Sequence, residues 1–260
     1  MDVLARGAAQ LGIQLTEREL ALFQRYYELL SEANRRVNLT AITGYMETQT
    51  KHFLDSLTCL LALPPELAAP GAETRLADVG SGAGFPGVPL KIVRPGFHVT
   101  LIESVRKKTD FLRTLVAALG LEHVTILTAR AEDVGRDPSH RERYDAVVAR
   151  AVARLDVLAE YCLPLCRVGG VFVAPKKAPV VEELALAAGA LKELGGAEAR
   201  VLELQLAPYL TDRVLVSVEK VRPTPERYPR RAGIPAKRPL GSRAGVPAVQ
   251  GTAEDVEVPG

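Results

Sequence analysis

Cysteine is scarce in this sequence, and no apolar segment is long enough to cross a membrane. Only three cysteines are present, Cys59, Cys162 and Cys166, and this odd, low number argues against a disulfide framework. Cys162 and Cys166 are four apart, but two ligands do not make a zinc site and no histidine lies close to this pair in sequence, so we interpret the cysteines as buried thiols. No apolar run approaches the roughly 18 residues that a spanning helix needs, and the N-terminus mixes charged with apolar residues, unlike a secretory signal. We therefore expect a cytoplasmic protein without a membrane partner.

Aromatic residues and catalytic arrangements are also scarce. Phe, Trp and Tyr together make up 5% of the chain, so we do not expect an aromatic stacking platform of the kind that single-strand binders use. No Ser-His-Asp, Cys-His or metal-ligand arrangement is recognisable. Among the four histidines, His98 and His123 begin predicted strands and His140 lies in a polar loop, so these three are interpreted as structural. We expect no metal site.

The composition is that of a protein with a packed core. Hydrophobic residues make up 47% of the 260 residues and charged residues 25%. Residues 1–63 have helical spacing, in which Thr16 and Glu19 form a capping-box pattern ahead of apolar residues at helical intervals. A second helix is expected over about 45–62, and prolines and a glycine mark a linker over 64–71.

From residue 74 the pattern changes to alternating strands and helices. The first five strands are expected at 75–79, 98–103, 123–129, 144–149 and 169–175, and helices at 105–119, 155–165 and 179–194. The last two strands, 201–206 and 213–220, are too close for a crossover helix and should form an antiparallel hairpin. The sequence predicts an α/β fold with a Rossmann-like, mostly parallel seven-stranded sheet, an antiparallel terminal hairpin and an N-terminal helical extension.

The chain therefore divides into a helical extension (1–63), a sheet domain (74–220) and a tail (221–260). The net charge of +2 hides an asymmetry, because residues 221–243 carry a formal charge of +6 and residues 244–260 a charge of −3. A basic, proline-spaced tail is consistent with a contact to a phosphate backbone and equally with a solvated tail. We expect irregular structure to about residue 242 and disorder beyond it.

The most informative segment is 78–87, Asp-Val-Gly-Ser-Gly-Ala-Gly-Phe-Pro-Gly. It follows the first predicted strand and opens a helix, which is where nucleotides bind in α/β sheets. Glycines at this place let an adenosine-bearing ligand lie against the backbone. Gly82, Gly84 and Gly87 satisfy the dinucleotide fingerprint literally, so a nicotinamide coenzyme is one candidate.

The position of the glycines favours S-adenosylmethionine instead. The dinucleotide fingerprint should begin directly after the strand, at Gly80, and its third glycine then falls on Phe85. Pro86 removes a backbone N–H that a diphosphate would need. S-Adenosylmethionine has no phosphate, and Asp78 before the loop suits its positive charge.

Two further carboxylates follow the second and third predicted strands. Glu103 comes 21 residues after Gly82 and can accept hydrogen bonds from both ribose hydroxyls, in either coenzyme. Glu132, after Ala131, lies where an adenine ring would be held and its amino group met. Either carboxylate could instead be an ordinary surface group.

These motifs together are similar to those of a known family. The segments concerned are NLTAIT (38–43), KHFLDSL (51–57), DVGSGAGFPGVPLKIVRP (78–95), RKKTDFL (106–112), RAED (130–133), ARAVA (149–153) and YPRRAGIPAKRPL (228–240). They resemble the bacterial small-subunit ribosomal RNA guanine-N7 methyltransferases, formerly called glucose-inhibited division protein B. The resemblance covers about residues 15–240, and the acidic end lies outside it.

The resemblance implies a class I S-adenosylmethionine-dependent methyltransferase that acts on N7 of a guanosine in the decoding region of 16S ribosomal RNA. It implies cofactor contacts at Gly80, Phe85, Glu103, Ser104, Val105, Ala131, Glu132 and Arg150, to which the glycine loop adds Gly82. One departure is Lys177, where many members have glycine, while Lys176 fills the usual lysine position.

RNA contacts are expected at several basic residues. Arg106, Lys107 and Lys108 start a helix beside the cofactor loop, although they could simply be a solvated helix face. The resemblance implies that Lys51 and His52 cap the cofactor or RNA side. Arg150 could reach RNA rather than cofactor. The remaining expected RNA contacts are Lys176, Arg230, Arg231, Lys237 and Arg238.

Guanine N7 carries a lone pair and no proton, so its methylation needs no general base, metal or covalent intermediate. We expect catalysis by in-line orientation alone, assisted at most by Arg150 and His52. The partner is expected to be 16S RNA, a precursor particle or the small subunit, and the protein a monomer. The alternatives are a nicotinamide-dependent oxidoreductase, which lacks a convincing proton relay here, and an inert RNA-binding module, which the intact loop disfavours.

Overall fold

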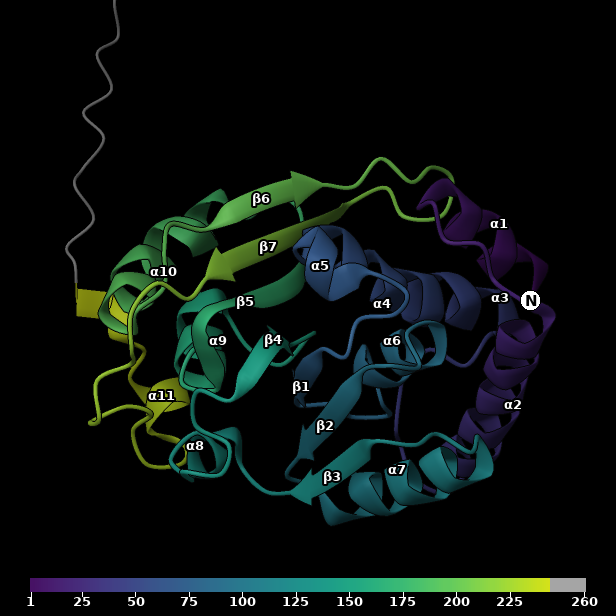
Figure 1. Cartoon of the computed structure of the whole chain (residues 1–260), viewed down its shortest axis with the longest axis horizontal. Helices are drawn as coiled ribbons and strands as arrows, with labels where there is room; N and C mark the ends of the chain where they lie inside the picture. Colours follow the sequence, from purple (N-terminus) through teal and green to yellow (C-terminus); the bar gives the residue numbers. More distant parts are fainter. Residues whose placement is uncertain (244–260) are drawn as a thin grey trace, which may run out of the picture.

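The computed structural model describes residues 1–243 as a seven-stranded sheet with helices on both faces (Figure 1). The strand order is β3-β2-β1-β4-β5-β7-β6, and only β7 runs antiparallel to its two neighbours, β5 and β6. The strands are β1 (Arg75–Val79), β2 (His98–Glu103), β3 (Val124–Thr128), β4 (Tyr144–Val148), β5 (Cys166–Lys177), β6 (Arg200–Glu203) and β7 (Arg213–Glu219). This confirms the predicted sheet and its terminal hairpin.

Alternate residues of each central strand face opposite layers, as the pleat requires. Leu76 and Leu101 belong to a core covered by α6 (Gly87–Val93), α7 (Arg106–Ala118) and the N-terminal helices. Ala77 and Val147 belong to a second core covered by α8 (Ala131–Val134), α9 (Leu155–Cys162) and α10 (Val181–Glu193). The strand β5 is longer than expected because it pairs with β7 as far as Lys177.

The N-terminal extension is part of the first core. Helices α1 (Asp2–Gln10) and α2 (Glu17–Asn34) contribute Leu4 and Phe23 to the same buried cluster as Leu76. The predicted capping box is confirmed, because the hydroxyl of Thr16 accepts from the Glu19 amide at 3.2 Å and the Glu19 carboxylate accepts from the Thr16 amide at 2.7 Å. The extension that ends at residue 63 is therefore distinct in its sequence pattern, but it shares one hydrophobic core with the sheet domain.

The second predicted helix is irregular. In place of one α-helix over 45–62, the chain forms α3 (Tyr45–Glu47), a wide π-helical segment η1 (Thr48–Leu54), α4 (Asp55–Leu57) and a 3-10 segment η2 (Thr58–Ala62). The expected linker contains a short helix, α5 (Pro65–Ala68). Buried polar side chains, including His52 and Asp55, lie in this irregular stretch.

The C-terminal segment 221–243 runs back over the second face of the sheet beside α8, α9 and α10 (Figure 1). It has little regular structure, as expected, apart from α11 (Ile234–Lys237) and η3 (Leu240–Arg243). The disorder predicted beyond residue 242 and the acidic end fall almost wholly on 244–260, outside the described residues.

Candidate functional site

The glycine loop after β1 needs glycine for two separate reasons. Gly80 has a φ of 73°, in the left-handed region that side chains avoid. A Cβ there would also lie 2.5 Å from the Cγ2 atom of Val152, so the loop after β4 approaches its backbone directly. The loop is held against β2, since the Gly80 amide donates to the carbonyl of Ile102 at 2.8 Å.

Asp78, near the end of β1, stabilises this loop through a hydrogen bond with its last residue, Gly87. It is fully buried, and its Oδ2 atom accepts from the Gly87 amide at 2.9 Å. Its Oδ1 atom has no hydrogen-bond partner among residues 1–243. Burial raises the pKa of Asp78 to about 7, against the Gly87 hydrogen bond, which favours the charged form. Asp78 is thus placed beneath the loop and does not line the cavity above it.

Glu103, at the end of β2, connects the two loops. Its Oε2 atom accepts from the Gly82 amide at 3.0 Å and its Oε1 atom accepts from the Val105 amide at 2.8 Å. The side chain is nearly buried, and each oxygen keeps a lone pair that no described residue occupies. The carboxylate is therefore fixed in place with acceptor capacity left for a ligand.

A cavity of about 400 Å³ opens at the carboxyl ends of β1, β2 and β3. It brings together six of the nine predicted cofactor residues, namely Gly80, Glu103, Ser104, Val105, Ala131 and Glu132. Residues that the sequence did not single out for the cofactor also line it, among them Lys108, Val152, Tyr161 and Ala236. We call it the cofactor cavity below, because its residues fit an adenosyl ligand.

Glu132 has a second task. It is buried, and its Oε1 atom accepts from the Gly233 amide of the tail at 2.8 Å. Gly233 itself has a φ of 81°. A residue predicted to meet the cofactor therefore also fastens the C-terminal segment beside the cavity.

The other predicted cofactor residues lie apart from the cavity lining. Gly82 does not line the cavity, but its amide donates to Glu103, which does. Phe85 and Arg150 form a cluster with His52. The rings of His52 and Phe85 stack at 4.4 Å, and the Arg150 guanidinium lies 5.1 Å from the centre of the Phe85 ring. Tyr26 of α2 stacks on Phe85 at 5.3 Å, so the N-terminal extension touches the glycine loop directly.

A buried carboxylate that sequence reasoning missed organises this cluster. Asp55 accepts from Arg150 at 2.7 Å and lies 2.9 Å from the Nε atom of Arg213 at the start of β7. Arg150 also contacts the Nδ1 atom of His52 at 3.2 Å. Burial, together with the Arg150 charge, lowers the pKa of His52 to about 3, so the imidazole is neutral at neutral pH.

The basic residues expected to contact RNA fall into two groups. Arg106 and Lys107 are exposed at the start of α7, and Lys108 lines the cofactor cavity. Lys51 is exposed and forms an ion pair with Glu47. Lys176 differs from the expectation, because its ammonium donates to the carbonyl of Ala153 and to Glu183, at 2.9 and 2.6 Å, and so supports the loop after β4.

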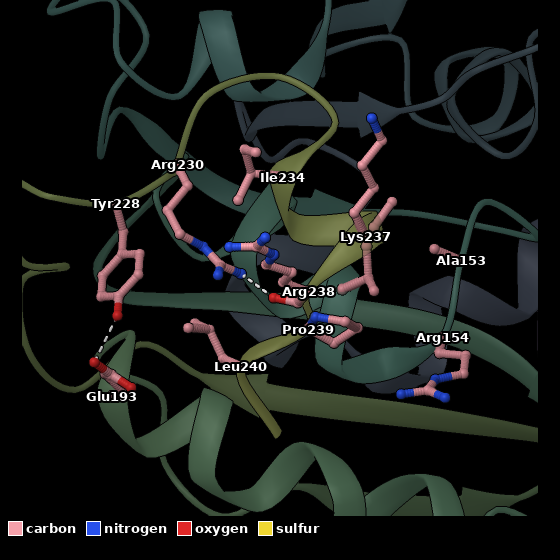
Figure 2. Close-up of a pocket in the computed structure, with 12 residues that line it drawn as sticks. Ala153, Arg154, Glu193, Tyr228, Arg230, Ile234, Lys237, Arg238, Pro239 and Leu240 are labelled. Carbon is pink, nitrogen blue, oxygen red and sulfur yellow. Dashed lines mark hydrogen bonds between the residues drawn. The ribbon is translucent and has the colours of Figure 1, made fainter. Parts of the chain in front are cut away.

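The tail is divided in the same way. Arg231, Lys237 and Arg238 are exposed, and the last two line a second cavity of about 1090 Å³ between the tail and α9 (Figure 2). Arg230 instead forms a charge-paired hydrogen-bond network with the buried carboxylate of Glu160. Its guanidinium thus has a buried protein partner that the charge pattern of the tail did not predict, while 25% of the side chain stays exposed.

Two general properties of the described chain bear on its environment and partners. Within residues 1–243 no helix is both long and apolar enough to span a bilayer. The cysteines are buried and unpaired, and burial raises the pKa of each thiol, as interpreted from the sequence.

Comparison with known proteins gives consistent matches. The model of the family described as rRNA small subunit methyltransferase G matches residues 19–208. Two relatives are named ribosomal RNA small subunit methyltransferase G. The protein from Pelotomaculum thermopropionicum is 53% identical over 92% of this chain and 98% of the relative. The protein from Roseiflexus castenholzii is 52% identical over 92% of this chain and 100% of the relative.

Solved structures share the fold. A geranyl diphosphate methyltransferase in complex with SAM has a TM-score of 0.51 at 16% identity, over 70% of this chain and 93% of the other. A SAM-dependent O-methyltransferase from Thermotoga maritima has a TM-score of 0.50 at 18% identity, over 74% and 71%. The predicted class I methyltransferase fold is confirmed by these likenesses.

Proposed function

Because the chain belongs to the rRNA small subunit methyltransferase G family, we propose that it transfers a methyl group from S-adenosylmethionine to N7 of a guanosine in 16S ribosomal RNA. The observation that carries the proposal is the cavity that the Gly80 loop and Glu103 form at the carboxyl ends of the strands. We place the reaction in the cytoplasm and propose that the protein acts as a monomer.

The residues around the cavity suit an adenosyl ligand. The free lone pairs of Glu103 match two ribose hydroxyls, and Val105 and Ala131 provide apolar sides for a flat base. A cavity of about 400 Å³ is within the usual range of small-ligand sites. Pro86 leaves the loop without one of the amide donors that a diphosphate would use.

The chemistry requires orientation more than proton transfer. The cofactor supplies an electrophilic methyl group on a sulfonium, and guanine N7 already has a lone pair and no proton to lose. Correct placement of two reactants contributes on the order of 7–11 kcal/mol to a barrier. We propose that the residues of this chain act by binding and orienting both partners, and that no metal or general base takes part.

The hydrogen bonds of His52 support this view. Its Nε2 atom lies 2.8 Å from the Thr40 hydroxyl and its Nδ1 atom 3.2 Å from Arg150, so both ring nitrogens are occupied. A proton acceptor needs a free nitrogen within reach of substrate. We propose that His52 and Arg150 position the glycine loop through the Phe85 ring.

We propose RNA contacts at seven cations, of which Lys108 is half-buried in the cofactor cavity, Lys237 and Arg238 line the second cavity, and the others are exposed on the surface. The seven are Lys51, Arg106, Lys107, Lys108, Arg231, Lys237 and Arg238. Cations that neutralise phosphates give salt-dependent RNA binding, and of this set Lys51 is already in an exposed ion pair with Glu47. Family membership disfavours the nicotinamide-dependent alternative, and the intact loop and cavity disfavour an inert RNA-binding module.

Labelled methyl transfer tests the proposal. Small subunits from cells that lack this activity, naked 16S RNA and precursor particles are each incubated with the protein and labelled S-adenosylmethionine. We expect label on guanine N7, identified by mass spectrometry of the digested RNA, in at least one of the three substrates. Subunits from cells that keep the activity are the matched control and should accept little label. Transfer to another atom, or none to any substrate, would refute the assignment.

A further inference from the structure

The C-terminal segment 228–240, called the strap below, is fastened to the sheet domain by hydrogen bonds to side chains of that domain. Arg136 and Arg141 donate to the carbonyls of Pro229 and Tyr228, each at 2.7 Å. Glu132 accepts from the Gly233 amide. A basic segment held only by charge attraction to RNA would need none of these contacts, so the strap is part of the folded domain.

The strongest of these attachments is Arg230 with Glu160. The Glu160 side chain is 1% exposed, and its Oε1 atom accepts from the Arg230 amide at 2.7 Å and from the guanidinium at 2.9 Å. Its Oε2 atom accepts from the same guanidinium at 2.6 Å. The guanidinium also donates to the carbonyl of Arg238 at 2.8 Å, which closes the strap on itself (Figure 2).

This pair leaves little capacity for an external anion. If a phosphate took Arg230, the buried Glu160 carboxylate would lose its counter-charge, and a buried unpaired charge is strongly unfavourable. The hydrogen bonds to Glu160 accordingly raise the pKa of Arg230. The role of Arg230 must be sought in what the strap does once it is in place.

The strap forms a wall between two cavities. Ala236 of α11 lines both the cofactor cavity and the second cavity, and Ala153 lines both from the loop after β4. Lys237 and Arg238 lie next to Ala236 in sequence and line the second cavity only. Three consecutive residues, Ala236 and Lys237 of α11 and Arg238 after it, therefore connect the cofactor side with the cations that we assign to RNA.

We propose that Arg230 is a positioning residue that, through Glu160, holds α11 as this shared wall, so that cofactor and RNA bind with positive coupling. The RNA part rests on the function proposed above, whereas the cofactor part stands alone. A ligand that contacts Ala236 binds only when the strap is docked, that is, held on the sheet domain by the Arg230–Glu160 pair. Ligand binding therefore favours the docked state. By reciprocity, a docked strap presents Lys237 and Arg238 in one arrangement to a phosphate chain.

Titration calorimetry of the full chain with S-adenosylhomocysteine, in the absence of RNA, tests the cofactor part. Arg230→Met is expected to weaken this binding roughly 10-fold, within the range usual for coupled sites. The matched control is Arg227→Met, which removes the arginine directly before the strap, whose ion pair with Glu193 is exposed. Such surface pairs contribute little, so the control should bind like the unmodified protein.

Hydrogen exchange adds a measurement that mere loss of stability would not reproduce. In the unmodified protein, S-adenosylhomocysteine should slow exchange of the strap amides, including that of Gly233. In the Arg230 variant this ligand-dependent slowing should be reduced. If Arg230→Met fails to fold, Ala236→Phe decides instead, because this exposed side chain can change without disturbing the core and should weaken ligand binding.

Two results would overturn the inference. One is unchanged S-adenosylhomocysteine affinity in the Arg230 or Ala236 variant. The other concerns the slope of log RNA affinity against log salt concentration. If Arg230→Met reduces the magnitude of this slope by about one and leaves the cofactor affinity intact, Arg230 contacts a phosphate directly. If the unmodified protein binds no 16S RNA at all, the proposed function fails and the cofactor comparison still decides the role of Arg230.

Discussion

The replacement of Glu103 by glutamine tests the cofactor cavity most directly. The change keeps the shape of the side chain and removes its charge and half of its acceptor capacity. In the folded protein both carboxylate oxygens already accept from backbone amides, those of Gly82 and Val105. A glutamine must turn its NH₂ group toward one of these amides, which places two donors against each other and leaves one buried N–H without a partner.

The magnitude follows from the interactions lost. A hydrogen bond to a charged group contributes about 1.5–3 kcal/mol. Loss of one such bond to a ribose hydroxyl therefore weakens S-adenosylhomocysteine binding about 10- to 150-fold, at 1.4 kcal/mol for each factor of ten. Loss of the hydrogen bond from the Gly82 amide would also loosen the glycine loop, which would weaken binding further.

Titration calorimetry of Glu103→Gln against the unmodified protein measures the effect. The matched control is Glu182→Gln, the same change at an exposed glutamate of α10 that lines no part of the cofactor cavity. We expect the control to bind normally. Equal affinity of the Glu103 variant and the unmodified protein would mean that the carboxylate does not contact the ligand, and the reasoning about the cavity would be wrong.

Two other predictions follow from local geometry. Gly80→Ala and Gly12→Ala both place alanine at a left-handed φ, 73° and 75°, and each should lower the free energy of unfolding in denaturant by about 1–2 kcal/mol. Only Gly80→Ala should also weaken S-adenosylhomocysteine binding. Its Cβ meets Val152, whereas the Cβ at position 12 meets nothing within 4 Å. His52, whose pKa is lowered to about 3, protonates more readily when unfolded, so acidification from pH 6.5 to 5 should reduce the unfolding free energy by about 1.6 kcal/mol relative to His52→Phe. Parallel pH profiles for those two proteins would show that the imidazole is not held neutral by the fold.

The cofactor cavity was largely predictable because its residues follow strand ends. Periodicity locates the strands, and parallel strands bring their carboxyl ends to one edge of the sheet, which places Gly80 and Glu103 together without knowledge of side-chain packing. Their proximity in space then follows from β1 pairing with β2. The prediction needed only the order of elements along the chain.

The Asp55 cluster was not predictable in this way. Asp55 lies 95 residues from Arg150 and on an irregular helical stretch. Helical spacing on an ideal α-helix does not describe which side chains of a π-helical segment face the sheet. Only the packing of the extension on the first face brings Asp55 between Arg150 and Arg213.

The attachment of the tail was not predictable for a related reason. The carboxylates that hold it lie far upstream in sequence: Glu160, which pairs with Arg230, is 70 residues away, and Glu132, which accepts from the Gly233 amide, is 101 residues away. Each of those acids occurs in a helix whose polar residues could equally have faced solvent. Charge counted along a sequence window misses partners that only the fold brings near.

The same counting affects what the tail can contribute to RNA binding. Its formal charge of +6 over 221–243 includes Arg222, Arg227 and Arg230, whose guanidinium groups already bond to protein acceptors. Arg231, Lys237 and Arg238 are exposed, and none of their side-chain nitrogens bonds to another described residue. Three phosphate contacts to a single strand correspond to a slope of about −2 in a plot of log affinity against log salt. The tail should therefore steer RNA to the second cavity with modest salt sensitivity, while the proposed role of Arg230 is to keep α11 beside the cofactor through Glu160.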